Sequence, residues 1–186
     1  NLKSAFSVGA IGLQTEQDIY KNIEVNAEGI FSVTLPENLP LSYRLFSDKD
    51  FLNGVNVGDI IKIQNYILAK NAINDPLSLI AADVNKSGKV TVADIVELRK
   101  LILGKIDQFS TGDSWVFIDA DFPLFVNNWE LANTYVSPTD DNDFYNEFLA
   151  VKVGDVDRLI FSRQYEVAVR NPKQKEILSL SREEGK

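Results

Sequence analysis

Apolar and polar residues alternate along the first quarter of the chain, in the manner typical of short β-strands. Residues 22–36, NIEVNAEGIFSVTLP, hold two alternating runs separated by a turn-rich stretch at 26–29, and residues 41–47, LSYRLFS, alternate again. Alternation of this kind places one face of each strand toward a core. Three or four short strands, in a small sandwich-like unit, are therefore predicted between residues 5 and 47.

The spacing of apolar residues changes to that of helices at about residue 57. Residues three or four positions apart share one helical face in two segments: Ile60, Ile63, Ile67 and Leu68 in the first, and Ile95, Leu98, Ile102 and Leu103 in the second. Gly104 is a suitable stop for the second helix. Residues 71–82, between the two helices, are predicted to be a connection with an apolar patch of its own.

Strand patterns return after residue 113, in SWVFIDA (114–120) and EFLAVKVGDV (147–156), which are separated by an acidic stretch. The pattern as a whole predicts an α+β fold with four parts. These are a β-sandwich-like domain at 1–47, a module of two loop–helix motifs at 48–107, a β-rich extension packed on that module at 108–158, and a linker or the start of another module at 159–186.

The two helical segments are copies of each other. Residues 48–70 and 83–105 are identical at eight of 23 positions when they are aligned with an offset of 35. Asp48 then coincides with Asp83, and Asp59 with Asp94. A single helix start would not repeat in this way, so an internal duplication is predicted.

Composition narrows the classes of function. The formal net charge of −8 argues against nucleic-acid and anionic-membrane partners and suits cation binding. The chain has no Cys and no His, which excludes disulfides, thiolate chemistry, the usual zinc sites and Ser-His-Asp triads. No apolar run approaches the roughly 18 residues that a membrane span needs, so membrane insertion is not expected. Since the chain begins without Met or a leader, we interpret it as a mature or excised piece of a longer protein.

The second copy contains a complete calcium loop of the EF-hand kind. Such loops take ligands from positions 1, 3, 5, 7, 9 and 12, with a backbone carbonyl at position 7 and glycine at position 6. Counted from the first aspartate, these ligand positions hold Asp83, Asn85, Ser87, Lys89, Thr91 and Asp94. Gly88 falls at position 6, and position 12 is Asp rather than the longer Glu.

The first copy is less regular. Its ligand positions hold Asp48, Asp50, Leu52, Gly54, Asn56 and Asp59. Leu52 has no side-chain oxygen, so water or a backbone carbonyl would have to replace that ligand, while three carboxylates partly compensate. Two calcium ions are expected, and whether this first loop holds one stays open.

A simpler interpretation is helix capping. Thr91 with Asp94, and Asn56 with Asp59, have the spacing of capping boxes. Capping does not explain Asp83 or the oxygen donors that follow it.

Three other acidic stretches, 119–122, 139–143 and 154–157, are interpreted as solvated loops, with acid/base pairs as the alternative. A third calcium site using Asp155 and Asp157 also stays an alternative, and Trp115 and Trp129 are interpreted as packing residues rather than sugar-stacking platforms.

The duplicated loop–helix motif resembles the dockerin family. Each loop is followed but not preceded by a helix, and DVNKSGKVTVADIVELRKLILG (83–104) follows the dockerin pattern, including Asp at position 12. The resemblance extends over residues 9–158. It is closest to modules of large multidomain secreted or surface proteins of bacteria, in which a carboxypeptidase-regulatory-like β domain often precedes the module.

This resemblance implies calcium binding and a protein partner. Dockerins bind cohesin domains through their helices, and the matching specificity positions here are Val57, Gly58, Val92 and Ala93, with Asn65 and Lys100 further on. The Ser-Thr pairs of cellulosomal dockerins are absent. A different, cohesin-like partner or a neighbouring domain of the same chain is therefore expected. The alternative is that Val57 and Val92 are core residues.

The expected function is therefore non-enzymatic. The resemblance implies an extracellular or bacterial cell-surface calcium-binding module that serves protein–protein assembly, or that forms a structural or adhesive part of a large surface protein. A carbohydrate-binding accessory domain of a secreted enzyme is the alternative. An intracellular calcium sensor is disfavoured because the chain has no Met, whereas sensors expose Met-rich grooves.

Overall fold

The protein is an α+β fold, as the pattern predicts. The computed structural model describes residues 11–15, 19–24, 31–34, 42–132, 135–136, 144–157 and 164–170. The strands are β1 (Ile11–Thr15), β2 (Ile19–Ile23), β3 (Phe31–Thr34), β4 (Tyr43–Ser47), β5 (Trp115–Asp119), β6 (Tyr135–Val136), β7 (Phe144–Lys152) and β8 (Gln164–Arg170). The helices are α1 (Val57–Ile67), α2 (Pro76–Ala82) and α3 (Val92–Ile102), with a 3₁₀ turn, η1, at Trp129–Leu131.

The described strands belong to one sheet, in the order β2-β1-β4-β5-β7-β8-β3, with β6 paired to β4. Neighbouring strands run antiparallel except β3 and β8, which are parallel. Because β4 pairs with β5, strands that precede the helices in sequence share a sheet with strands that follow them. The pattern of the sequence did not predict β8.

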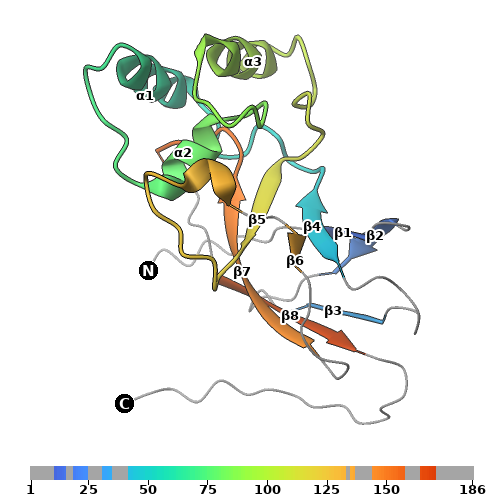
Figure 1. Ribbon diagram of the computed structural model, residues 1–186. Coiled ribbons are helices and arrows are strands. Elements are labelled where there is room, and N and C mark those ends of the chain that lie inside the picture. The colour runs from blue at the N-terminus through green and yellow to red at the C-terminus, as the bar shows by residue number, and fades with distance from the viewer. Residues whose placement is uncertain are drawn as a thin grey trace, which may run out of the picture.

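The helices gather at one end of this sheet. α1 and α3 lie side by side, and α2 lies between them and the upper part of the sheet (Figure 1). The prediction of a connection at 71–82 is wrong for residues 76–82, which form α2. Asp75 caps this helix, since its Oδ2 accepts the Ser78 amide at 3.1 Å, and Pro76 fits its first turn because proline has no amide hydrogen to lose there.

The helical faces predicted to be apolar form much of the core. Ile63 and Leu98 are fully buried, and Ile60 and Ile95 are nearly so, in a cluster that also includes Val116 of β5 and residues of β7. Burying one such side chain stabilises the fold by roughly 1.5–3 kcal/mol. Leu68 and Leu103, predicted on the same faces, are instead exposed. The reason is that they are the C-cap residues and lie beyond the last helical turn.

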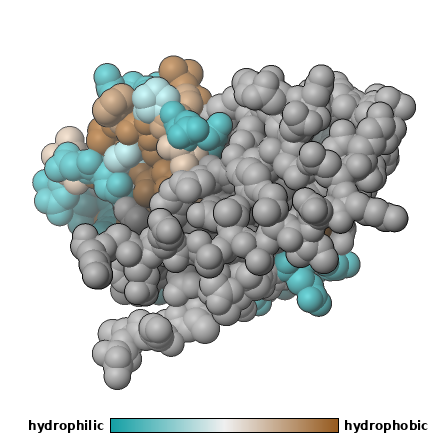
Figure 2. Space-filling model, turned by 90° about the horizontal axis from the view of Figure 1, so that it is seen from below, coloured by the Kyte–Doolittle hydropathy of each residue, from teal (hydrophilic) through white to brown (hydrophobic). Residues whose placement is uncertain are grey.

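The opposite faces of α1 and α3 leave large apolar side chains in solvent. Val57 is 58% exposed and Val92 59%, so the alternative that they are core residues is wrong. Apolar side chains are also exposed in the connection after β5, and the view from below shows an apolar area edged by hydrophilic residues (Figure 2). None of the helices in the described part of the chain has the length and apolar character needed to cross a membrane.

Candidate metal centre

α1 and α3 begin in the same way, with an aspartate in the first turn that is fully buried. Asp59 Oδ2 accepts the Asn56 amide at 2.8 Å, and Asp94 Oδ2 accepts the Thr91 amide at 2.7 Å, so both predicted capping boxes are confirmed. Capping uses one oxygen of each carboxylate. The other oxygen, Oδ1, accepts the Asn85 amide in Asp94 and the Val156 and Asp157 amides in Asp59. The donating segment therefore differs between the two helices.

The loop before α3 folds around Ser87. The Ser87 amide donates to Asp83 Oδ1 at 2.9 Å and to Asn85 Oδ1 at 3.0 Å, which brings two predicted ligand oxygens together. The Ser87 hydroxyl lies 3.0 Å from the Lys89 carbonyl oxygen and 3.3 Å from Asp83 Oδ1. The Asn85 amide reaches Asp94 Oδ1 at 3.4 Å. Since the Thr91 amide and hydroxyl donate to Asp94 Oδ2, all six predicted ligand residues are linked by a chain of short contacts.

The sixth predicted ligand, Thr91, caps α3 through its Oγ1, which accepts the Ala93 amide at 3.2 Å. The tight course of the loop depends on left-handed backbone at Gly88, where φ is +77°, a conformation that costs glycine little. Gly88 also donates its amide to Asp83 Oδ2 at 2.7 Å.

The donor set of this loop fits calcium. Carboxylate, amide, hydroxyl and backbone carbonyl oxygens are the hard ligands that calcium takes in proteins. Burial raises the pKa of Asp83 above its usual range, although the amides of Ser87 and Gly88 oppose this rise. A nearby divalent cation would favour the charged carboxylate and so offset the burial.

The loop before α1 is not a structural copy of the other. Its left-handed residues are Asp50 and Gly54, four positions apart, whereas those of the second loop are Lys86 and Gly88, two positions apart. The Leu52 carbonyl accepts the Val55 amide at 3.0 Å, and the Leu52 side chain is exposed. The Gly54 carbonyl accepts the Asn56 side-chain amide at 3.2 Å. These two carbonyls serve the turn itself.

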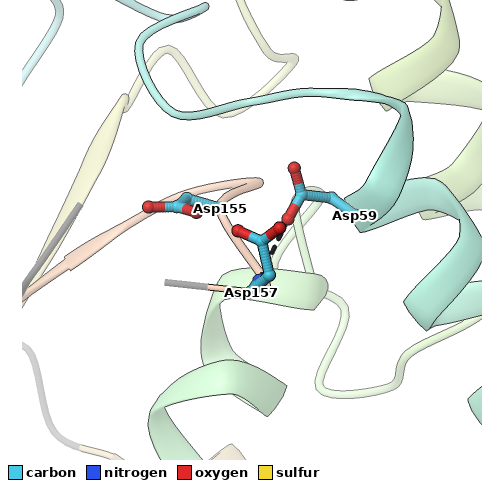
Figure 3. A group of neighbouring side chains, drawn as sticks. All are labelled: Asp59, Asp155 and Asp157. Atoms are coloured by element: carbon cyan, nitrogen blue, oxygen red, sulfur yellow. Dashed lines mark hydrogen bonds between the residues drawn. The ribbon is translucent and has the colours of Figure 1, made fainter. Parts of the chain in front are cut away.

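Asp59 instead lies close to two aspartates from a distant part of the chain, Asp155 and Asp157. Its Oδ1 accepts the amide of Val156 at 2.7 Å and that of Asp157 at 3.0 Å. One carboxylate oxygen each of Asp59, Asp155 and Asp157 lies within 4.8 Å of the others, and this group does not include Asp48 or Asp50. Asp59 comes from the first turn of α1, and the other two come from the turn after β7 (Figure 3).

The residues after β7 correspond to the start of the complete loop. GDVD at 154–157 resembles ADVN at 82–85, and the middle valine of each is buried. The Asp157 amide donates to Asp59 Oδ1, as the Asn85 amide donates to Asp94 Oδ1. The segment 154–157 therefore donates backbone amides to the buried aspartate of α1, as the segment 82–85 donates one to the buried aspartate of α3. The sequence favoured a solvated loop at 154–157, with a third calcium site using Asp155 and Asp157 as the alternative, but Asp155 and Val156 are buried. The likeness of the two tetrapeptides was a signal for the observed arrangement.

Burial shifts the pKa of Asp59 in the same direction as that of Asp83. It raises the pKa of Asp59, and the nearby Asp157 carboxylate raises it further, while three amides act against the rise. Three close carboxylates, two of them almost completely buried, form a strongly anionic environment. Such an environment suits a cation with oxygen ligands.

Two helices that each begin with a buried aspartate beside a set of oxygen donors form a paired loop–helix arrangement whose donors suit calcium. Residues 52–103 match the model of the family described as Dockerin type I domain, and this range holds all three helices. The match supports a dockerin-like module in this part of the chain. No curated protein and no solved structure matches the chain.

Proposed function

We propose that this chain is a calcium-binding, dockerin-like module that serves protein–protein assembly and is not an enzyme. The observation that carries the proposal is the linked set of oxygen donors at 83–94, inside the range that matches the dockerin model. Dockerin domains bind calcium and cohesin domains, and they are assembly modules rather than catalysts. Bound calcium would neutralise the carboxylates that the fold brings together.

The proposed calcium sites differ in construction. The first is the continuous loop 83–94, held by Asp83, Asn85, Ser87, the Lys89 carbonyl and Asp94. The second, which we call the split site, is formed by Asp59 with Asp155 and Asp157. The split site takes the place of the continuous loop 48–59, whose ligand assignment from the sequence stays a prediction.

The proposed partner surface is the outer face of α1 and α3. It carries four exposed apolar residues in equivalent pairs: Val57 with Val92, and Ile61 with Val96. Most of the exposed charged residues of the two helices and the segments that follow them are basic, although the chain carries a net charge of −8: Lys62, Lys70, Arg99, Lys100 and Lys105. The acidic residues there are Asp107, which is exposed, and Glu97, which is half-exposed. A cohesin-like domain, or a neighbouring domain of the same chain, with an apolar centre and an acidic rim would complement this face.

The wider context is part of the proposal. We place the module in a large extracellular or cell-surface protein of bacteria, where it has a structural or adhesive role beside a carboxypeptidase-regulatory-like domain. The division into 1–47, 48–107, 108–158 and 159–186 stays a prediction. A carbohydrate-binding role gains no support from Trp115, which is 3% exposed and offers no stacking surface.

Calcium titration of the full chain by calorimetry tests the proposal. We expect the wild type to bind two ions, Asp83→Ala to lose the ion of the continuous loop, and Asp157→Ala to lose the ion of the split site. Asp48→Ala is the matched control, because Asp48 belongs to loop 48–59 and not to the split site, and it should keep both. A wild type that binds no calcium would overturn the proposal. Loss of an ion in Asp48→Ala, with both ions kept in Asp157→Ala, would assign the second site to loop 48–59.

A further inference from the structure

A buried lysine stands next to the split site. Lys152 is the last residue of β7, and it is 3% exposed. Its Nζ donates to three backbone carbonyl oxygens, those of Phe51 at 3.0 Å, Ser114 at 3.2 Å and Val153 at 3.4 Å. An ammonium group has three hydrogens to donate, so these three carbonyls match its full capacity.

The three carbonyls belong to three segments that meet at the Lys152 ammonium group. Phe51 lies in the turn that leads to α1, and Ser114 precedes β5. Val153 immediately precedes GDVD, the segment that carries Asp155 and Asp157. Burying an ammonium group is costly unless its hydrogen bonds are satisfied. Moving any of the three carbonyls away would leave a buried donor unsatisfied, so the buried lysine favours a fixed arrangement of its three partners.

We propose that Lys152 is a positioning residue of the split calcium site. By holding the Phe51 turn and residue 153 to the same ammonium group, it sets the distance between the start of α1 and the segment 154–157. That distance lets the amides of Val156 and Asp157 meet Asp59 Oδ1. This inference rests on the proposed function for the identity of the ion.

The charge of Lys152 could act against this role, because the carboxylates that act on its ammonium group include Asp155 of the split site. Simple repulsion between Lys152 and the ion would have the opposite effect from positioning. If repulsion were its main effect, removing the ammonium would tighten calcium binding, whereas loss of positioning would weaken it. The sign of the change therefore distinguishes the two.

The first test is calcium affinity in an Asp83→Ala background, in which the split site alone is measured. Lys152→Met keeps an unbranched side chain one atom shorter than lysine and removes the charge and the hydrogen-bond donors. We expect the dissociation constant for calcium to rise about tenfold or more, as is usual for residues that orient metal ligands. Lys62→Met is the matched control, because Lys62 is an exposed lysine whose Nζ lies 3.5 Å from the Val156 carbonyl oxygen. It should leave the affinity unchanged or slightly tighter.

The second test needs no calcium. Hydrogen exchange of the Val156 and Asp157 amides, measured in chelator, reports whether they still donate to Asp59. We expect Lys152→Met to lose protection at these two amides while the amides between β5 and β7 stay protected, and Lys62→Met to lose none. A wild type that binds no calcium at the split site would overturn the proposed function there, but the exchange measurement would still test Lys152.

Protection and affinity equal to the wild type, or tighter binding, in folded Lys152→Met would overturn the inference. If Lys152→Met does not fold, Lys152→Gln takes its place, since its amide group keeps two donors without the charge. Partial protection and an intermediate affinity in Lys152→Gln would support positioning. Binding by Lys152→Gln as tight as that of the wild type or tighter would contradict it.

Discussion

Gly154 shows how closely the segment of the split site approaches the helices. A Cβ at this position would lie 2.8 Å from Leu98 Cδ2 and 3.0 Å from Val55 Cγ2, and φ is +87°, a value that L side chains rarely adopt. We expect Gly154→Ala to lower the free energy of unfolding by about 2–4 kcal/mol, because overpacking adds to backbone strain. Calcium affinity at the split site should fall as well. Urea denaturation and calcium titration measure the two effects.

Gly104 provides the control for that substitution. Its φ is +62°, but nothing lies within 4 Å of the position its Cβ would take. Gly104→Ala should therefore lose only the roughly 1–2 kcal/mol of left-handed strain and leave calcium binding unchanged. Equal losses in the two variants would contradict the importance of close approach at Gly154.

The ionisation of Lys152 predicts a dependence of stability on pH. Burial lowers its pKa to about 8 from 10.5, although Asp155 and Asp50 act in the opposite direction. The unfolded chain therefore holds this proton more tightly than the folded chain. As pH rises through the interval between these two pKa values, the unfolded state binds more protons, so the free energy of unfolding rises, by up to about 3 kcal/mol.

Comparison with Lys152→Met isolates this contribution from those of the other lysines and the tyrosines. Urea denaturation of both proteins at several pH values from neutral to 10.5 should show the wild type gaining stability relative to the variant as pH increases. Lys62→Met, treated in the same way, should run parallel to the wild type. A constant difference between the wild type and Lys152→Met would show that the burial of Lys152 is not coupled to its ionisation.

At the scale of residues, the spacing of residues in the sequence predicted candidate calcium ligands only where those ligands lie in one continuous segment. The donors of loop 83–94 lie at fixed spacing in one short segment, and the structure links all six of them. Asp155 and Asp157 are about a hundred residues from Asp59, and tertiary contacts such as the pairing of β7 with β5 and the bond of the Gly154 amide to the Ala81 carbonyl bring them to the start of α1. Spacing along the chain carries no information about such an approach.

At the scale of elements, the three helices separate capping from calcium binding. α1 and α3 start with capping aspartates that also belong to the candidate calcium sites, whereas α2 starts with Asp75, which caps without being part of either site. We expect Asp75→Ala to lower the free energy of unfolding by about 1 kcal/mol, the usual value of an N-cap, equally in calcium and in chelator. Asp94→Ala should behave differently.

Asp94→Ala should lose a similar capping contribution in chelator and considerably more in calcium. At a calcium concentration a hundred times the dissociation constant, binding to the folded state adds about 2.7 kcal/mol, which the variant would forfeit. Thermal melting of both variants with calcium and with chelator measures this difference. Equal losses for Asp94→Ala in the two conditions would mean that capping alone explains the aspartate.

The sequence pattern predicted α1 and α3 but not α2. α1 and α3 were predicted because apolar residues recur in their sequences with a helical period, at Ile60, Ile63 and Ile67 and at Ile95, Leu98 and Ile102. α2 was missed because it is only seven residues long and nearly all buried, so it has no polar face to set a period, although its Asp-Pro start is a helix signal. Pairing was not predictable either, because the partners of β4 are distant in sequence.

At the scale of the whole molecule, a buried charge connects loop 83–94 to the sheet. Asp113 is 4% exposed, and its Oδ2 accepts the Lys86 ammonium at 2.6 Å and the Arg44 guanidinium at 2.9 Å. Lys86 lies inside the loop, and Arg44 lies in β4, where its Nε also donates to Gln14 of β1 at 2.8 Å. Order in the calcium loop is therefore linked to the strands β4 and β1.

We expect Asp113→Asn to weaken that link. The neutral amide leaves two cations without their counter-ion, and removal of one partner from a buried ion pair costs about 3–5 kcal/mol, less here because Lys86 and Arg44 are partly exposed. In the wild type, calcium should slow hydrogen exchange at Leu13 and Leu45 as well as in the loop. In Asp113→Asn it should slow exchange in the loop alone. Lys49→Ala, which removes an exposed pair with Asp48, should change neither stability nor exchange. If calcium protects Leu13 and Leu45 equally in Asp113→Asn, the strands are stabilised by another route, and the connection through Asp113 is only local.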